Sequence, residues 1–241
     1  MSNILSIRNE ARYGCPQADQ ILFNRHYITG YSYYFRQARW TLEIIDSNRT
    51  HVRRVDDFRV DVRVPEMYHQ VLSDYKQDPH VYDRGHLVAS GDQAGTIISN
   101  SETFLLSNMS PQRAGFNQGI WRDLEMAVRE LSDKSEVLET YVMSGPIFYF
   151  NKAIQMLGEC TDKKLGIPIP HAYFKSVLIE NNRGTLSMWS FILDNQKSHK
   201  HFKEYLIRAD KVELLTGITL WNLLIGTDAR SKIEKTTLWK T

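Results

Sequence analysis

Five short segments rich in β-branched and aromatic residues constrain the fold of this 241-residue chain more than any other feature. Each has the composition typical of a strand, and together they are residues 27–34, 39–45, 140–143, 174–179 and 188–193. Helical patterns occur without the regular strand–helix alternation of a doubly wound sheet. We therefore predict an α+β fold whose central, mostly antiparallel sheet is flanked by helices.

The strongest helical pattern runs from residue 116 to about residue 131. Its apolar residues Trp121, Leu124, Val128 and Leu131 recur at steps of three and four, which gives one apolar stripe. We expect this stripe to face the sheet and the opposite face to carry polar groups.

Two weaker helical patterns lie elsewhere in the chain. Residues 65–79 begin and end with proline and place apolar residues at helical spacing. Near the end, Asp210 and Glu213 form a capping-box pattern, and Gly217 is suited to end the short helix that follows.

Composition and termini give only broad expectations. The chain is 42% hydrophobic and 24% charged with a net charge of +2, which permits a local nucleic-acid-binding patch without arguing for one. No linker divides it, so we expect one domain over residues 1–241. Cys15 and Cys160 are expected to be free thiols.

The first eight residues lack the basic and apolar regions of a signal peptide, and no apolar run approaches a membrane span. We expect cytoplasmic synthesis and no membrane contact, with delivery or secretion by another route left open.

Residues 83–86 read Asp83-Arg84-Gly85-His86, which places a base next to a cation. A neutral imidazole is available near neutral pH to take a proton from water, and arginine binds phosphate. We expect an extended segment to project Arg84 and His86 to opposite faces, and a turn at Gly85 to bring both to one phosphate, and the two geometries stay open. Arg53 and Arg54 are candidates to extend this phosphate-binding surface.

The helix over residues 116–131 carries Asn117, whose amide oxygen is a hard ligand suited to Mg²⁺. On a regular helix Glu125 and Arg129 lie roughly 80° and 120° around from Asn117, so the three share one broad face. Taken singly, each has a simpler interpretation. Glu125 and Arg129 form an ordinary exposed ion pair, Asn117 an N-cap, and His86 a structural histidine.

In combination, these residues resemble the signature of the DNA/RNA non-specific endonucleases, the ββα-metal or His-Me finger nucleases. The signature comprises residues 83–87, Ser107-Asn108 with Pro111-Gln112, and the run from Asn117 through Gly119 and Trp121 to Leu124-Glu125. Flanking segments also resemble the family, so the resemblance spans about residues 12–225. These segments are Arg12-Tyr13-Gly14, Phe58 with Asp61, Asp74-Tyr75, Ser144-Gly145-Pro146, Ile167-Pro168, Tyr173-Phe174-Lys175 and residues 215–218.

The resemblance implies a role for each matching residue. His86 matches the general base, Asn117 the direct protein ligand of Mg²⁺ (with Mn²⁺ as a substitute), and Glu125 the acid that binds the waters of that ion. Arg84 and Arg129 match arginines that contact phosphate. Asn108 matches an active-site asparagine that supports the base.

The activity implied is a Mg²⁺-dependent, sugar-nonspecific hydrolysis of DNA and RNA to products with 5′-phosphates. Two alternatives stay open: a sequence-specific nuclease of the homing or restriction type, and a nucleic-acid-binding protein that no longer cuts. A nuclease made in its own cytoplasm threatens the host, so we expect an inhibitor or immunity protein as a partner, and a homodimer is also compatible with the family.

Overall fold

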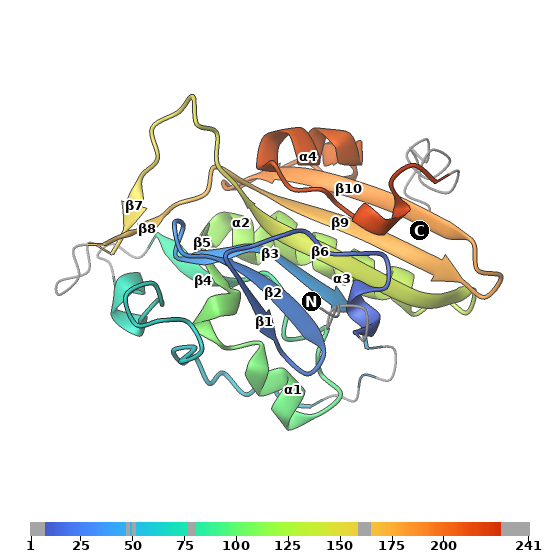
Figure 1. Cartoon of the computed structure of the whole chain (residues 1–241), viewed down its shortest axis with the longest axis horizontal. Helices are drawn as coiled ribbons and strands as arrows, with labels where there is room; N and C mark the ends of the chain where they lie inside the picture. Colours follow the sequence, from blue (N-terminus) through green and yellow to red (C-terminus); the bar gives the residue numbers. More distant parts are fainter. Residues whose placement is uncertain (1–7, 47–48, 50–51, 77–80, 159–164, 228–241) are drawn as a thin grey trace.

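The computed structural model describes residues 8–46, 49, 52–76, 81–158 and 165–227. One seven-stranded sheet forms its centre, and all of its neighbouring strands run antiparallel (Figure 1). In spatial order the strands are β1 Gln20–Phe23, β2 Tyr27–Ser32, β3 Gln37–Ile44, β6 Val137–Ile147, β9 Ala172–Asn181, β10 Leu186–Asp194 and β11 Leu206–Ile207. The predicted α+β class is confirmed, and all five predicted strands lie in this sheet.

Two small antiparallel sheets lie beside the large one. The first pairs β4 Tyr82–His86 with β5 Met109–Arg113, and the second pairs β7 Met156–Leu157 with β8 Ile167–Pro168. The connection from β4 to β5 contains α1 Ile97–Glu102. Short helical turns lie at η2 Asn9–Ala11, η3 Leu72–Tyr75, η4 Leu106–Asn108, η6 Phe202–Tyr205 and η7 Asn222–Leu224.

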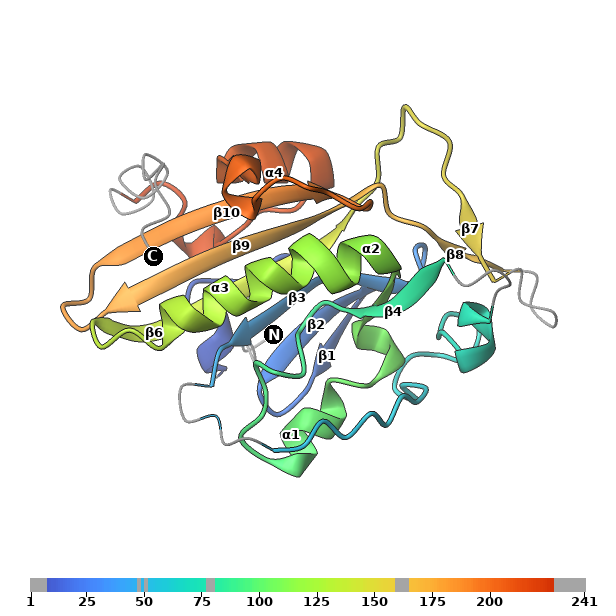
Figure 2. The same cartoon turned by 180° about the vertical axis from the view of Figure 1, so that it is seen from behind.

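The predicted helix over residues 116–131 is confirmed and covers one face of the large sheet (Figure 2). It consists of α2 Ala114–Phe116, a π-helical turn η5 Asn117–Trp121, and α3 Arg122–Ser132. The whole predicted stripe is buried against the sheet. Inside the π turn, Gly119 leaves helical geometry with φ −108° and ψ −116°. Such turns interrupt the regular angular spacing of side chains, and they are frequent at functional sites.

The helix α4 Ala209–Thr216 packs against a second cluster on the opposite face of the sheet. It ends at Gly217, which has the left-handed φ of 64° that glycine adopts readily. The capping-box prediction is wrong. Arg208 precedes the helix, Asp210 lies within its first turn, and Glu213 accepts a hydrogen bond from the backbone of Leu220 instead.

The predicted helix over residues 65–79 is also wrong, since within it the structure forms only the turn η3, and residues 77–80 lie outside the described part. Of the apolar residues that suggested a buried stripe, Tyr75 is buried, whereas Met67 is 59% and Leu72 41% exposed. Gln70 is buried as well, and its amide donates to the carbonyls of Arg36 and Met109. A polar side chain therefore fixes this segment to β5.

Cys15 is a free thiol, as expected, whereas Cys160 lies outside the described residues. Among the helices described, none has both the length and the apolar character needed to cross a membrane.

Candidate active site

The two halves of the predicted site meet through β4, β5 and the helix that follows β5. In the β4–β5 register His86 lies opposite Met109, and Arg84 lies opposite Pro111. The chain then enters α2 directly, and Asn117 follows. The indole Nε1 of Trp121 donates to the carbonyl of His86 at 3.3 Å, which ties the helix to the end of β4.

Gly85 forms no turn, because β4 remains extended through His86. Our expectation that an extended segment would separate Arg84 from His86 was wrong, since residues two apart on a strand share a face. Gly85 is needed for close packing instead. A Cβ atom at this position would lie 2.2 Å from the side chain of Gln112, whose amide is fully buried.

His86 lies against two aromatic rings, and an arginine packs over each of them. Its ring centroid is 4.9 Å from that of Phe104 and 5.7 Å from that of Phe58. The guanidinium of Arg84 lies 4.1 Å from the centroid of Phe58, and that of Arg54 lies 4.8 Å from the centroid of Phe104. These distances are typical of cation–π contacts. Of the two further candidates for the phosphate surface, Arg54 is thus part of the site.

Burial and the two cations have one electrostatic effect on His86. Loss of solvation, together with Arg54 and Arg84, lowers the pKa of His86 to about 3. Its side chain is half-buried, and its Nε2 atom is buried without a hydrogen-bond partner among the described residues. The imidazole is therefore neutral at physiological pH and has a free ring nitrogen.

The amide of Asn117 is oriented by Asp83. Asn117 Nδ2 donates to Asp83 Oδ2 at 2.9 Å, and Gln118 donates to the same oxygen. Asn117 Oδ1 makes no hydrogen bond to the described residues. Asn117 lines a cavity of about 740 Å³. The same cavity is lined by Arg54, Phe58, Lys76, Asp83 and Arg84.

This donor set fits a hard divalent cation that keeps most of its waters. The described residues contain no group of three or more His, Cys, Asp or Glu side chains placed to bind a metal. A single amide oxygen facing a polar cavity suits Mg²⁺, which is commonly bound through few protein ligands. Asn117 therefore fits the ligand that the sequence predicted.

Glu125 lies in a polar layer between the helix and the sheet. Burial raises its pKa to about 7, Lys175 lowers it, Asp92 raises it and Arg129 lowers it. The Trp121 indole also donates a hydrogen bond to it, which favours the charged form. Arg129 itself pairs with Asp92 at 2.6 Å. The interpretation as an exposed Glu125–Arg129 ion pair is wrong, because Glu125 is half-buried and the partner of Arg129 comes from another segment.

Asn117 and Glu125 are therefore not related by the rotation of roughly 80° that a regular helix would give. The π turn separates Asn117 from Glu125, and the two have different partners, Asp83 and the polar layer. Trp121 is the common neighbour, because its indole contacts both the His86 carbonyl and Glu125.

Sequence reasoning missed three charged residues of the polar layer: Glu43, Asp92 and Lys175, each at most 2% exposed. The Lys175 ammonium lies 3.0 Å from the Ser144 hydroxyl and 4.4 Å from the centroid of Trp121. For Glu43 and Lys175 the signal was a charged residue inside a predicted core strand, since such positions rarely hold a charge without a buried partner.

Two acids of this layer, Glu43 and Asp92, interact with each other. Gln93 donates to Glu43 at 2.8 Å, and burial together with Asp92 raises the pKa of Glu43 well above its usual value.

Asn108 contacts backbone and not the base. Its Oδ1 accepts from the amide of Val88, and its Nδ2 donates to the carbonyls of Val88 and Thr103. With every polar atom of its side chain used, Asn108 fixes the segment that follows His86. Its predicted support of the base is therefore indirect.

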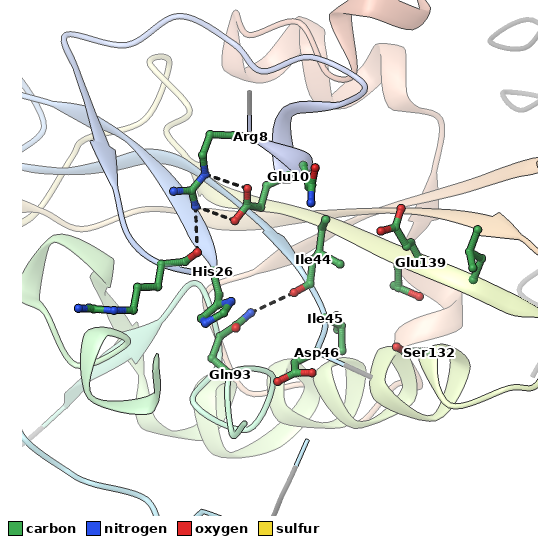
Figure 3. A pocket seen from close by; sticks show the side chains of 13 residues that line it. Arg8, Glu10, His26, Ile44, Ile45, Asp46, Gln93, Ser132 and Glu139 are labelled. Atoms are coloured by element: carbon green, nitrogen blue, oxygen red, sulfur yellow. Dashed lines mark hydrogen bonds and ion pairs between the residues drawn. The ribbon is translucent and has the colours of Figure 1, made fainter. Parts of the chain in front are cut away.

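A separate cavity of about 530 Å³ lies beside β3 and contains none of the predicted site residues (Figure 3). Charged residues that line it are paired, since Arg8 binds Glu10 at 2.7 Å, Arg25 binds Glu102 and Glu139 binds Arg12 at 3.3 Å. We therefore assign the chemistry to the cavity beside Asn117.

Comparison with known proteins gives the family of this chain. The family model described as DNA/RNA non-specific endonuclease matches residues 8–224. The chain is 29% identical to mitochondrial endonuclease G of Caenorhabditis elegans, over 87% of this chain and 70% of that protein. It is 30% identical to nuclease C1 of Cunninghamella echinulata var. echinulata, over 88% and 87%.

A crystal structure of an EndoG/EndoGI complex, described as showing the mechanism of EndoG inhibition, has the same fold. It matches with a TM-score of 0.81 and 25% identity, covering 92% of this chain and 94% of that one. With a family model that matches nearly the whole described chain, this protein belongs to the DNA/RNA non-specific endonucleases and is a nuclease.

Proposed function

We propose that this nuclease is a Mg²⁺-dependent, sugar-nonspecific endonuclease that cuts DNA and RNA to products with 5′-phosphates. His86 is the general base. The observation that carries the proposal is a neutral histidine with a free nitrogen, held beside two arginines and next to a cavity that contains an oriented amide oxygen.

Arg84 and Arg54 bind the scissile phosphate. Each guanidinium lies over an aromatic ring, and Arg84 has no carboxylate partner among the described residues. An anionic phosphate would compete with the two rings for these guanidinium groups. The same negative charge offsets the cations that lower the pKa of His86, so the base binds its proton more firmly once substrate is present.

In the reaction His86 takes a proton from water, the water oxygen attacks phosphorus, and the bond from phosphorus to the 3′ oxygen breaks. Asn117 would hold Mg²⁺ through Oδ1, with Asp83 fixing the amide. When bound, the cation neutralises charge on the phosphate and on the departing 3′ oxygen.

The remaining predicted residues act around this centre. Glu125 would bind the waters of the cation, whose charge would favour the ionised carboxylate and offset the effect of burial on its pKa. Arg129 holds Asp92 and contributes positive charge beside Glu125. Asn108 positions the backbone after His86.

The alternatives make different predictions. A sequence-specific nuclease would give discrete bands on plasmid DNA, and a non-cutting binder would retain DNA at every divalent metal without cleavage. We also propose a protein inhibitor as a partner, which the inhibited state named for the structurally similar complex supports.

The test is degradation of plasmid DNA and of RNA by pure protein with Mg²⁺, with chelator, and after His86→Ala. We expect activity only with the metal, and a loss in kcat of about 10²–10⁴-fold in the variant, the range of general-base catalysis. His69→Ala is the matched control. Full activity of His86→Ala would overturn the assignment of the base.

A further inference from the structure

A second hollow, of about 810 Å³, lies next to the catalytic cavity at the start of α2. Three exposed cations line it: Arg113 at the end of β5, Lys152 in the loop from β6 to β7, and Lys197 after β10. Figures 1 and 2 both show that loop standing beside α2. We call this hollow the basic groove.

The charge in the basic groove is not neutralised by neighbouring side chains. Most described arginines pair with a carboxylate, but Arg113 contacts only a ring, 5.1 Å from the centroid of Tyr82. Within the described residues Lys152 and Lys197 also form no ion pair. Asp194 is the one acid in the lining. The groove therefore carries positive charge that is available to an anion.

Hydrogen bonds fix the residues that line the groove. Asn195, 5% exposed, accepts from the amide of Arg113 and donates to the carbonyls of Pro111 and Pro170. His171 accepts from the amide of Tyr149 through Nδ1, and its Nε2 lies 3.2 Å from the carbonyl of Ala153. The second pair fixes the loop that carries Lys152. The cations are thus presented by a fixed framework.

The groove and the catalytic cavity share their two walls. Along β4, Tyr82 lines the groove, while Asp83 and Arg84 line the cavity. Along the helix, Gly115 lines the groove and Asn117 lines the cavity, and a Cβ atom on Gly115 would lie 3.0 Å from Lys197. Two residues along a strand span roughly 7 Å. Phosphates on one strand of a duplex are about 3.4 Å apart along the axis, so the groove and the cavity are separated by a length that one nucleic-acid backbone covers.

We propose that the basic groove is a second phosphate-binding subsite that holds the nucleic-acid backbone beyond the cleaved bond, a proposal that rests on the proposed function. Arg113 and Lys197 bind backbone phosphates next to the scissile one, and Lys152 binds a phosphate farther out. The groove sets how tightly a long polynucleotide is held and leaves the chemistry at His86 unchanged.

The test is binding of a single-stranded DNA of about 20 nucleotides at several salt concentrations, in the His86→Ala background so that the DNA stays intact. Arg113→Gln/Lys197→Gln is compared with Arg183→Gln/Lys211→Gln, which removes the same charge from exposed positions outside both cavities. Loss of two phosphate contacts lowers the slope of log K against log salt by about 1.4. The control pair leaves the slope unchanged.

Cleavage by the same pairs with His86 intact separates this proposal from the proposed function. We expect the groove pair to raise KM on long DNA at least several-fold while kcat at saturation stays within about twofold. An unchanged salt slope in a groove pair that still cleaves DNA would overturn the subsite alone. Absence of cleavage by the unaltered chain would instead overturn the proposed function.

Discussion

His86 and Glu125 are both half-buried next to Trp121, yet their pKa values shift in opposite directions. Burial disfavours the charged form of each, so it lowers the pKa of the histidine to about 3 and raises that of the carboxyl to about 7. The neighbours differ as well. Arg54 and Arg84 reinforce the effect of burial on His86, whereas Lys175 opposes it on Glu125.

The comparison shows how one helix–strand junction holds a group that must be neutral beside a group that must be charged. His86 is neutral before substrate binds, because burial and the two arginines already lower its pKa. The carboxyl ionises fully near neutral pH only when a cation joins Lys175 and Arg129. Each region therefore suits its proposed role through its local charges, and the following changes test that division.

The largest effect is expected from Asp83→Ala, which frees the Asn117 amide to rotate. Loss of a residue that orients a metal ligand typically weakens metal affinity 10–100-fold. The Mg²⁺ concentration for half-maximal cleavage should rise by that factor, with kcat largely recovered at saturating Mg²⁺. Asp123→Ala, exposed on α3, is the control. An unchanged Mg²⁺ requirement would show that Asp83 does not act through Asn117.

A smaller effect is expected from Lys175→Met, which removes the cation beside Glu125 at similar volume. Because Lys175 lowers the pKa of Glu125, its loss moves the acid limb of the kcat–pH profile to higher pH. Activity at pH 6 should fall by roughly three- to tenfold and recover near pH 8. Lys211→Met on α4 should leave the profile in place. A uniform loss at every pH would indicate a purely structural role for Lys175.

The smallest effect is on the pH dependence of stability, measured by urea unfolding in the presence of chelator. The depressed pKa of folded His86 means that unfolded chains bind its proton first, so its contribution to stability is lost as pH falls from 6.5 toward 3. The raised pKa of Glu125 acts oppositely, and its contribution is lost as pH rises from 4.5 through about 7.

Each of these slopes is at most about 1.4 kcal/mol per pH unit, and the two cancel where their windows overlap. His86→Ala should remove the first slope, and Glu125→Gln should remove the second. The same pH dependence in both variants would contradict the opposite shifts.

The sequence predicted the parts of the fold that follow from local patterns. Strand composition located the core of the large sheet, and the stripe at Trp121, Leu124 and Val128 located its covering helix. The helix prediction over residues 65–79 was wrong because tertiary hydrogen bonds bury Gln70, while Met67 and Leu72 stay exposed. Local pattern cannot anticipate a carbonyl supplied by another segment.

The candidate site divides in the same way. Arg84 and Asn117 line one cavity, and His86 lies two residues from Arg84 on the same strand, because β4, β5 and the helix follow one another along the chain. The partners Glu43, Asp92 and Lys175 come from three other places in the chain. Their meeting depends on sheet order and loop path, which residue spacing does not encode.

The π turn at residues 117–121 has a consequence for anyone who would move this site into another scaffold. Successive residues of a regular helix are rotated by about 100°, and the wider turn alters the angle between Asn117 and the layer that holds Glu125. The same two side chains copied at the same spacing onto an ideal helix would point in the wrong relative directions. A one-residue deletion in this turn should therefore leave Asn117 and Glu125 present but change the angle between their side chains.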